Sequence, residues 1–420
     1  MQSTLSRGTF ALVLVVVFAN SAGCKNEPAK EASCPPPASH EIPRVRVLLA
    51  GRTEQVRLRS ETPFTITDQA GVVLDTQTAP QWRAIGSTSA QSVTFADGRF
   101  SHGPAIRIVP SSGGTCWLSF PRESGWSLPA AYPGTVQILA TDTGKLDVVN
   151  DVDVETYVSC VVTEEVWPDF ATEAYRGQAI IARTFVLHQM TARSQSAYDI
   201  VATEAAQVYR GIRSDTTAIR AGEATRQTRG IVCTWNNDGK EQLFPTYYHA
   251  ACGGTSQSAT IFGKQNDIEP LRGQVACDFC KIAPKGAYRW GPIELSTREV
   301  LNRLVARYPD LATLRRIEGI DVIKRTPGGR PLRLSLTGVG GETFEMSAEH
   351  FRLAIGAREV RSTNCTISVE GGRVIIKDGR GFGHGLGLCQ WGMQGQALAG
   401  KKAADILRYY YPGSNLVRAY

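Results

Sequence analysis

The sequence predicts an α+β protein, in which a β-rich N-terminal region packs with a mixed helix and strand catalytic region. Two observations lead to this prediction. Short runs of aliphatic and β-branched residues recur between turn residues from 44 to 150, and a helical apolar period begins near Ala171. With 420 residues, the chain can bury a large core and form one large or two to three modest domains.

Residues 1–24 are typical of a bacterial export signal. Arg7 precedes an apolar run that is too short to span a membrane comfortably. The tripeptide Ala-Gly-Cys that ends at Cys24 is the end of a lipobox. We therefore expect an exported protein, held by a lipid on Cys24 at the periplasmic side of a membrane. Ser21 stands where a lipobox usually has leucine, so simple signal cleavage is the alternative.

Residues 25–43 are rich in proline, alanine, serine and glutamate, which predicts a partly extended tether and not a fold. The net charge of +7 is spread along the chain and mildly favours an anionic polymer of the cell envelope as a partner. No lysine-rich tract is present, so nucleic acid is not an expected partner.

Residues 44–150 form the predicted β-rich supporting region. Aliphatic runs such as Val45–Leu49, Phe64–Ile66 and Val136–Ala140 are separated by turn residues, as expected of short strands. Nothing in this region indicates chemistry by itself.

Residues 151–288 form the predicted catalytic region. A helix is expected to begin at Pro168, and the adjacent acids Glu164 and Glu165 stand just before it. Side chains of adjacent residues on an extended segment point to opposite sides, so one acid can be solvated while the other is enclosed. Enclosure raises the pKa of a carboxyl, as a general acid near neutral pH requires. The alternative is a pair of ordinary surface carboxylates near a positive helix end.

A zinc site is predicted in the same region. His249 and Cys252 are spaced H-x-x-C, and Cys277 and Cys280 form C-x-x-C after a loop rich in glycine and serine. One imidazole and three thiolates complete the tetrahedral set of a structural zinc site, which has no open position for chemistry. Cys277 and Cys280 could instead form a disulfide in an exported protein. Any pairing among the remaining cysteines cannot be deduced from sequence.

Residues 289–363 form a predicted structural module. Ser296–Glu299 is a capping box at the start of an amphipathic helix, and Thr326–Gly329 indicates a hairpin turn. Residues 364–420 contain a last strand pair, a glycine-histidine stretch and C-terminal helices. From Ala397 to Tyr411 the pattern is mostly helical and ends before a Pro-Gly pair.

The stretch Gly379–Gly395 has the sequence GRGFGHGLGLCQWGMQG. Glycine alternates with larger residues up to Gly387, which predicts an extended segment with a bare face that another group can approach closely. The segment contains His384, and the pattern becomes helical at Gln390. A glycine-histidine pair alone is more typical of a loop with a packed histidine, and no set of these glycines satisfies G-x-G-x-x-G.

Several blocks of the sequence resemble those of a known protein family. GFGHGLGLCQWG with the following ALAGKKAADILRYYYPG forms one block, and VVTEEVWP with EAYRGQAIIARTFVL and QVYRG forms another. The segment YPGTVQILATDTGKLDVVNDVDVETYV leads into the second block. Together they resemble the stage II sporulation protein D family, over roughly residues 44–420. That family includes peptidoglycan lytic transglycosylases and proteins described as amidase enhancers.

The resemblance implies roles for particular residues. Glu165 falls on the family's catalytic acid, whereas Glu164 occupies a position that often carries a small residue. Gln178 and Arg183 fall on polar helix positions of the family and are expected to contact substrate. Tyr209, in QVYRG, would line a sugar groove, with core packing as the alternative.

The implied reaction is lytic cleavage of the β-1,4 bond between N-acetylmuramic acid and N-acetylglucosamine, in glycan strands that include strands stripped of stem peptides. Glu165 would act as both acid and base and leave a 1,6-anhydro end. His384 and Gln390 would hydrogen-bond the sugar or position Glu165, while the glycines at 383, 385 and 387 would let glycan lie against the backbone.

Two other functions fit the same residues. A non-catalytic module could bind glycan in the same groove and present it to a cell-wall amidase, which would then be a partner. A zinc hydrolase is the weaker alternative, because the predicted metal site is closed.

Overall fold

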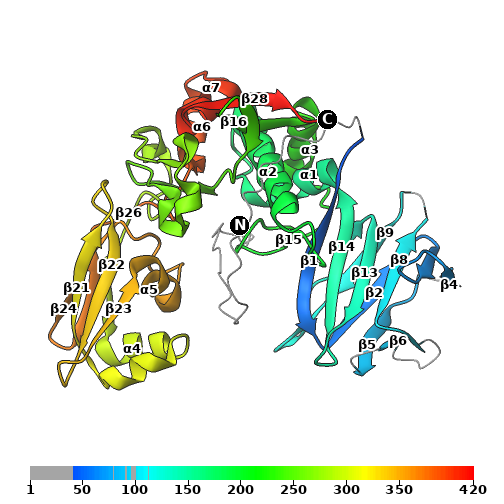
Figure 1. Ribbon diagram of the computed structural model, residues 1–420, viewed down its shortest axis with the longest axis horizontal. Helices are drawn as coiled ribbons and strands as arrows, with labels where there is room; N and C mark the ends of the chain where they lie inside the picture. The colour runs from blue at the N-terminus through cyan, green and yellow to red at the C-terminus, as the bar shows by residue number, and fades with distance from the viewer. Residues whose placement is uncertain (1–40, 79, 90–91, 96–100, 112) are drawn as a thin grey trace, which may run out of the picture. The chain divides into compact units, whose positions relative to one another are not determined.

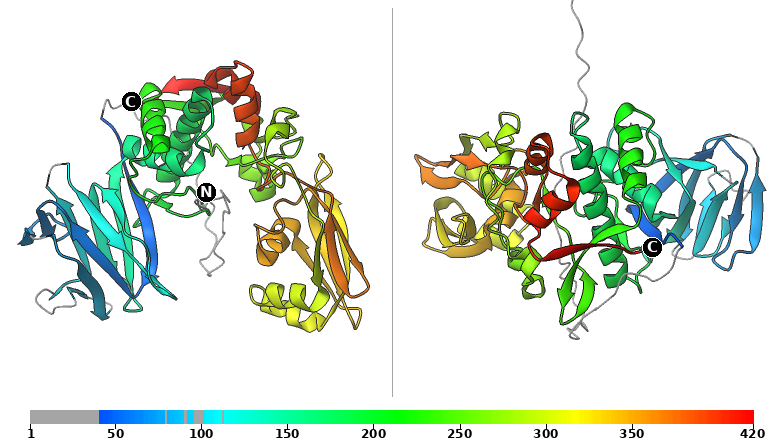
Figure 2. Two further views of the ribbon diagram at one scale, coloured as in Figure 1. Left: turned by 180° about the vertical axis from the view of Figure 1, so that it is seen from behind. Right: turned by 90° about the horizontal axis from the view of Figure 1, so that it is seen from above.

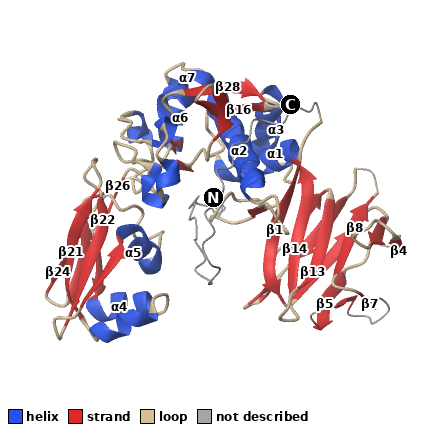
Figure 3. Cartoon of the chain, viewed as in Figure 1, coloured by secondary structure: helices blue, strands red, loops and turns tan. Residues whose placement is uncertain are grey.

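The computed structural model describes residues 41–78, 80–89, 92–95, 101–111 and 113–420 (Figure 1). The expected export signal, its Cys24 and all but the last three residues of the tether lie outside the described residues. Helices and many strands are both present, which confirms the α+β class (Figure 3). The chain forms two compact units: unit 1 extends to Pro245 and includes Leu416–Tyr420, and unit 2 is Thr246–Asn415.

A seven-stranded sheet in unit 1 has the order β15-β1-β14-β13-β8-β3-β4. Its strand β1 (Arg44–Thr53) pairs antiparallel with β14 (Leu146–Asp153) and parallel with β15 (Ile200–Val201). Alternate residues of β1, such as Val45 and Val47, are fully buried, as the period of two along a strand requires. The other strands of this sheet are β3 (Phe64–Thr67), β4 (Val73–Gln77), β8 (Ala105–Pro110) and β13 (Thr135–Ala140).

A second sheet of unit 1 has the order β12-β9-β2-β5-β6-β7. Blue and cyan in Figure 2 mark the strand-rich N-terminal part of the described chain. The buried residues of the second sheet, such as Val56, Leu58 and Ile85, alternate with more exposed ones, so this sheet also buries one face. Its strands are β2 (Gln55–Ser60), β5 (Arg83–Ser89), β6 (Ser92–Phe95), β7 (Ser101–His102), β9 (Thr115–Ser119) and β12 (Ala130–Pro133). A short hairpin pairs β10 (Pro121–Arg122) with β11 (Gly125–Trp126). The N-terminal part of the described chain is therefore β-rich, as predicted.

Three helices of unit 1 follow the strands. They are α1 (Val154–Glu165), α2 (Thr172–Ala192) and α3 (Thr216–Gln227), and each packs against the other two. Asp153 caps α1 by accepting a hydrogen bond from the backbone N–H of Thr156, and Asp215 caps α3 in the same way. The helix predicted near Pro168 thus begins at Thr172, with its apolar face buried.

A three-stranded sheet completes unit 1 in the order β17-β16-β28. The predicted hairpin is present between β16 (Ile231–Asn237) and β17 (Lys240–Leu243). Its turn residues Asp238 and Gly239 both have positive φ, as a tight two-residue hairpin requires. The third strand, β28 (Ser414–Arg418), brings the C-terminus back to unit 1.

Unit 2 begins with a region of short elements. Strand β18 (Tyr248–His249) pairs in parallel with β27 (Leu388–Cys389), and β19 (Arg289–Trp290) pairs with β26 (Gly379–Arg380). Chain segments that are distant in sequence are therefore brought together around the glycine-histidine stretch. The 3-10 turns of this region are η1 (Ala259–Phe262), η2 (Lys264–Asn266), η3 (Glu269–Leu271) and η4 (Phe279–Ile282).

The rest of unit 2 contains two three-stranded sheets and two helices around a common apolar core. Ser296 accepts a hydrogen bond from the backbone N–H of Glu299 and begins α4, so the predicted capping box is confirmed. The elements are β20 (Ile293–Ser296), α4 (Thr297–Val305), η5 (Pro309–Leu314), β21 (Ile317–Arg325), β22 (Pro331–Gly338), β23 (Thr343–Ser347), α5 (Ala348–Ile355), β24 (Thr366–Glu370) and β25 (Arg373–Lys377).

The C-terminal helical region contains α6 (Gln390–Leu398) and α7 (Ala403–Tyr410). The expected helical stretch is thus interrupted, because Gly400 adopts a φ of 83° and ends the first helix. Across the described residues, none of the helices has both the length and the apolar character that a membrane crossing needs.

Candidate functional site

The two adjacent acids lie in the last turn of α1, so the expectation of an extended segment was wrong. Glu165 is only 2% exposed, and its Oε1 accepts a hydrogen bond of 3.0 Å from the backbone N–H of Val208. Glu164 instead accepts from Nη1 of Arg213 at 2.8 Å and lies 3.5 Å from Nη1 of Arg210. The side chain of Glu164 is itself only 5% exposed, so the predicted contrast between a solvated and an enclosed acid is not found, and the two acids differ in their partners instead.

One loop, between β15 and α3, holds both carboxylates. Its backbone at Val208 binds Glu165, and its half-exposed side chains Arg210 and Arg213 bind Glu164. Glu164 is therefore neutralised by two guanidinium groups, whereas the hydrogen bond to Glu165 comes from a neutral peptide group.

Arg183 is fully buried and makes a bidentate ion pair with Glu155, at 2.9 and 2.7 Å. It also donates to the backbone carbonyl of Ile231 at 3.1 Å, and Tyr420 donates to Glu155 at 2.7 Å. Burial acts to raise the pKa of Glu155, but the hydrogen bonds and charge of Arg183 outweigh it and lower that pKa. All of these partners are protein groups, so the expected contact of Arg183 with substrate is not supported. Arg183 instead joins α2 to α1.

Tyr209 is also in the core. Its hydroxyl donates to Oδ1 of Asn150 at 2.7 Å, and its ring lies 5.1 Å from that of Tyr157 and 5.7 Å from that of Tyr132. The structure thus favours core packing over a place in a sugar groove. Gln178 is likewise fully buried, in the middle of α2.

The segment Gly379–Gly387, which we name the glycine-histidine loop, is not extended as expected. Gly381, Gly383, Gly385 and Gly387 all have positive φ, between 61° and 102°. Alternation of glycine here reflects repeated left-handed backbone, which residues with a Cβ adopt only at a cost.

The bare face of the glycine-histidine loop meets the protein's own chain. A Cβ on Gly387 would overlap the carbonyl of Tyr247, and one on Gly383 would come within 2.9 Å of Cβ of His249. A Cβ on Gly385 would come equally close to the guanidinium of Arg330. The expectation that glycan lies against these glycines was therefore wrong, because segment 247–252 and Arg330 fill that space.

His384 and Gln390 are both enclosed. His384 is 1% exposed, and its Nδ1 accepts a 2.9 Å hydrogen bond from the backbone N–H of Leu386, which places the proton on Nε2. Burial, followed by the nearby Arg352 and Arg330, lowers the pKa of His384 to about 3. Gln390 is fully buried in the first turn of α6. The structure places both residues in the interior of unit 2, where neither faces an open groove.

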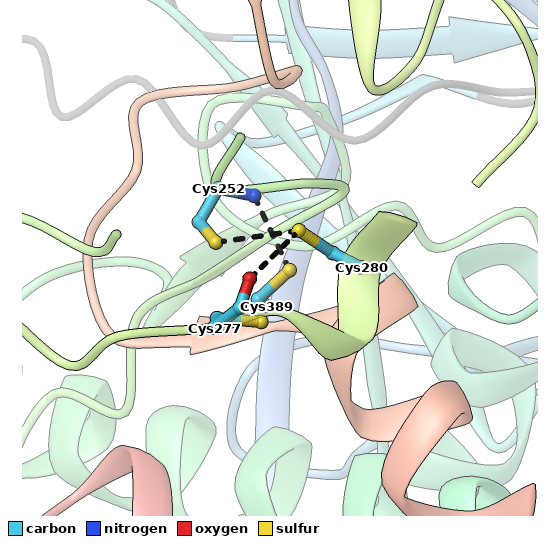
Figure 4. Close-up of side chains that lie close together, drawn as sticks. All are labelled: Cys252, Cys277, Cys280 and Cys389. Atoms are coloured by element: carbon cyan, nitrogen blue, oxygen red, sulfur yellow. Dashed lines mark hydrogen bonds between the residues drawn. The ribbon is translucent and has the colours of Figure 1, made fainter. Parts of the chain in front are cut away.

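Four cysteines of unit 2 converge, and their sulfur atoms lie within 4.8 Å of one another (Figure 4). Three of them, Cys252, Cys277 and Cys280, were predicted as metal ligands. The fourth is Cys389 and not His249, whose Nδ1 lies 2.9 Å from the carbonyl of Leu386 instead. The parallel pairing of β18 with β27 sets Cys389 opposite His249, which explains how this thiol takes the expected histidine's place.

The cysteine cluster has the geometry of a closed metal site. A tetrahedral zinc ion bound to four sulfurs at about 2.3 Å separates them by about 3.8 Å, and Sγ of Cys252 lies 3.6 Å from Sγ of Cys280. Hydrogen bonds from neighbouring thiols lower the pKa of Cys277 and Cys280 and raise the pKa of Cys252, and burial raises the pKa of Cys389. The eight cysteines of the described part of the chain are all free thiols, so the alternative disulfide between Cys277 and Cys280 is absent.

A comparison with known protein families matches the segment that contains the acid pair. Residues 142–235, which include α1 and α2, match the family model described as stage II sporulation protein. This match defines the class: proteins with a stage II sporulation protein domain.

Similarity to individual proteins extends well beyond that segment. The chain is 31% identical over 303 residues to an uncharacterised protein of Brachyspira hyodysenteriae, which covers 71% of this chain and 76% of that protein. It is 24% identical over 335 residues to stage II sporulation protein D of Bacillus subtilis, covering 76% and 90% of the two chains. An amidase enhancer of Bacillus subtilis is 24% identical over 292 residues, covering 61% of this chain and 39% of that protein. The chain belongs to the stage II sporulation protein D family.

Proposed function

We propose that this protein is a lytic transglycosylase of the bacterial cell wall, with Glu165 as its single acid and base. The observation that carries the proposal is the burial of Glu165 at the end of α1, within the segment that matches the family model. The substrate would be peptidoglycan glycan strands, including strands stripped of stem peptides.

The proposed reaction needs one carboxyl group and no water. Glu165, protonated, gives its proton to the glycosidic oxygen of the leaving N-acetylglucosamine as the bond from C1 of N-acetylmuramic acid breaks. The resulting carboxylate then removes the proton from the 6-hydroxyl of the same muramic acid, whose oxygen bonds to C1. The products are a 1,6-anhydro end and a free 4-hydroxyl, and Glu165 regains its proton.

The ion pairs of Glu164 support a scheme with one acid. Ordinary glycoside hydrolysis uses two carboxyl groups at a defined separation, one of which activates water or attacks the sugar. Glu164 is the neighbouring carboxylate, but Arg213 and Arg210 engage it. Because both oxygens of Glu164 are engaged by arginines of this loop, we assign Glu164 a role in holding the loop that binds Glu165.

Product analysis tests this function. The full chain is incubated with purified denuded glycan, and the digest is analysed by mass spectrometry. We expect fragments that end in 1,6-anhydro-N-acetylmuramic acid. Reducing ends that have gained water would instead indicate a hydrolase, and an intact glycan would exclude turnover.

A second function is favoured by one relative, which is named an amidase enhancer. In this function the protein binds glycan without cleaving it and presents it to a cell-wall amidase. Wild-type protein that binds cell-wall sacculi in a pull-down, forms no product and accelerates an added amidase would support this function over the first.

We also propose that the cysteine cluster binds a structural zinc ion through Cys252, Cys277, Cys280 and Cys389. Four thiolates leave no open position, so the ion would stabilise unit 2 and take no part in the reaction. Zinc would join three parts of unit 2: the segment around Cys252, the turn η4 and the strand β27. These parts contain little regular secondary structure.

A lipid on Cys24 would anchor the exported protein at the periplasmic side of a membrane. The support is the Ala-Gly-Cys sequence after a short apolar run. Cells fed radioactive palmitate should yield labelled protein, and a Cys24→Ser variant should lose the label. An unlabelled wild-type protein would exclude the anchor.

A further inference from the structure

Unit 2 contains a cavity of about 190 Å³ that none of the proposed roles uses. Its walls come from η1, from the start of β22 and from α5. The volume is far above the roughly 10–15 Å³ that one water molecule needs. It is below the 300–1,000 Å³, roughly, of pockets for drug-sized ligands. The cavity therefore suits one small ring and its substituents.

The polar part of the cavity contains one ion pair, one imidazole and several neutral groups. Glu349 lies in the wall, but both its oxygens accept hydrogen bonds from the buried guanidinium of Arg352, at 2.9 and 2.6 Å. The imidazole of His350 also lies in the wall, and its ring stacks on that of Tyr308 with the centroids 5.9 Å apart. The amide of Gln257 and the hydroxyls of Ser347 and Thr363 are neutral. Because an ion pair that is satisfied internally offers little to a free ion, a neutral ligand with hydrogen-bonding groups fits best.

The apolar part of the cavity is formed by Phe262, Leu332 and Leu353, among others. The ring of Phe262 is held at 5.7 Å from that of Tyr247 and 6.0 Å from that of His384, so it is a rigid wall. An aromatic ring suits the apolar face of a pyranose, and leucine side chains suit the methyl group of an acetamide.

We propose that this cavity is a binding subsite for one N-acetylated pyranose of a glycan strand. The acetamide N–H would donate to Oε1 of Gln257, since Nε2 of Gln257 already donates to the carbonyl of His384. The sugar ring would lie against Phe262. The inference rests on the proposed function for its choice of polymer, and it adds a contact to glycan away from Glu165.

The subsite also explains the glycine-histidine loop. Gln257 is fixed twice by this loop, because its backbone N–H donates to the carbonyl of Gly385 at 2.8 Å. Gly385 in turn leaves room for the buried guanidinium of Arg330, which donates to the carbonyls of Cys252 and Thr255 and precedes Pro331 in the cavity wall. The loop would thus act as a positioning element for the cavity walls.

Methyl NMR of the full chain tests this subsite directly. A Glu165→Gln background prevents turnover, and tetra-N-acetylchitotetraose is the probe. We expect the methyl signals of Leu332 and Leu353 to shift as the tetrasaccharide concentration rises, and both shifts to fit the same Kd. Absence of any shift at both leucines would overturn the proposal even if the wild-type enzyme cleaves glycan, so the two proposals fail independently.

Two comparisons sharpen this test. Leu353→Trp fills the cavity and should abolish the shift at Leu332, whereas Ile323→Trp, at an exposed position of β21, should leave it unchanged. Cellotetraose lacks the acetamide hydrogen bond, worth about 1 kcal/mol, and should bind about 3- to 10-fold more weakly. Equal binding of cellotetraose would overturn the assignment to N-acetylated sugars.

Discussion

The end of α1 in unit 1 and the glycine-histidine loop in unit 2 both contain buried polar side chains, but these are held in different ways. Glu165 accepts a hydrogen bond from the backbone N–H of Val208, in a loop whose arginine side chains are half-exposed. His384 is packed between aromatic rings, and the glycines around it receive other parts of the same chain. The first arrangement suits a group that exchanges protons, whereas the second suits a scaffold. The most conspicuous sequence motif, the glycine-histidine loop, is therefore not the place to which we assign the chemistry.

Metal removal is expected to have the largest effect, and it tests the scaffold half of this comparison. Structural zinc sites contribute about 10–16 kcal/mol of binding energy in small domains, so loss of zinc should unfold much of unit 2. Purified protein should contain about one zinc per chain, and Cys389→Ser should lose it.

Two controls accompany the cysteine variant. Cys365→Ser, a buried thiol outside the cluster, should keep zinc, and His249→Ala should keep it as well. Zinc that survives in Cys389→Ser but disappears in His249→Ala would restore the histidine as the fourth ligand. Metal analysis and circular dichroism provide the two measurements.

Arg183→Met tests whether a buried cation of unit 1 is structural. Removal of one partner of a buried ion pair costs about 3–5 kcal/mol, because Glu155 would keep an uncompensated charge. Urea unfolding should show this loss, while KM for glycan should be unchanged in the folded protein. A raised KM at unchanged stability would return Arg183 to the substrate site.

A comparison of alanine variants at two glycines distinguishes the cost of close packing from the cost of backbone strain. Gly387→Ala and Gly400→Ala both place a Cβ on left-handed backbone, which costs about 1–2 kcal/mol. Only Gly387 also faces an overlap, with the carbonyl of Tyr247, whereas nothing lies near a Cβ on Gly400. Overpacking adds about 1–3 kcal/mol, so Gly387→Ala should be the less stable variant in urea unfolding. Equal losses would mean that the loop is not tightly packed.

Lowering the pH should gradually reduce the stability that the ion pair of Glu155 contributes. This effect is expected to be smaller than those of the preceding variants. The pKa of Glu155 in the folded protein lies below its ordinary value of 4.5. Its contribution to stability is therefore complete above pH 4.5 and declines as the pH falls through the folded pKa. The stability difference between wild type and Glu155→Gln should be constant above pH 4.5 and shrink as the pH falls from 4.5 to 3, as urea unfolding would show. A difference that stays constant over that fall would mean that the carboxylate is not stabilised in the fold.

Much of the local structure could be predicted because its causes are local. The capping box at Ser296 and the hairpin turn at Asp238 and Gly239 each depend on a few adjacent residues, and both are present. The resemblance to the family assigned the acid role to Glu165, which the structure shows to be buried, and that role stays a prediction.

The rest depended on contacts between distant segments. Cys389 was missed as a member of the cluster because only the pairing of β18 with β27 brings it beside Cys252. The glycine alternation was misinterpreted because a period of two fits both an extended strand and a loop with repeated positive φ. Only the close approach of segment 247–252 distinguishes them.

The central claim is that one of two adjacent carboxyl groups performs the chemistry, and a matched pair of variants tests it most directly. Release of anhydro-muropeptide ends from denuded glycan is measured for Glu165→Gln and Glu164→Gln, with folding checked by circular dichroism. We expect Glu165→Gln to be slower by about 10²–10⁴-fold, the range typical of general acid-base catalysis, and Glu164→Gln to stay within about tenfold of wild type. Near wild-type release by Glu165→Gln would contradict the assignment.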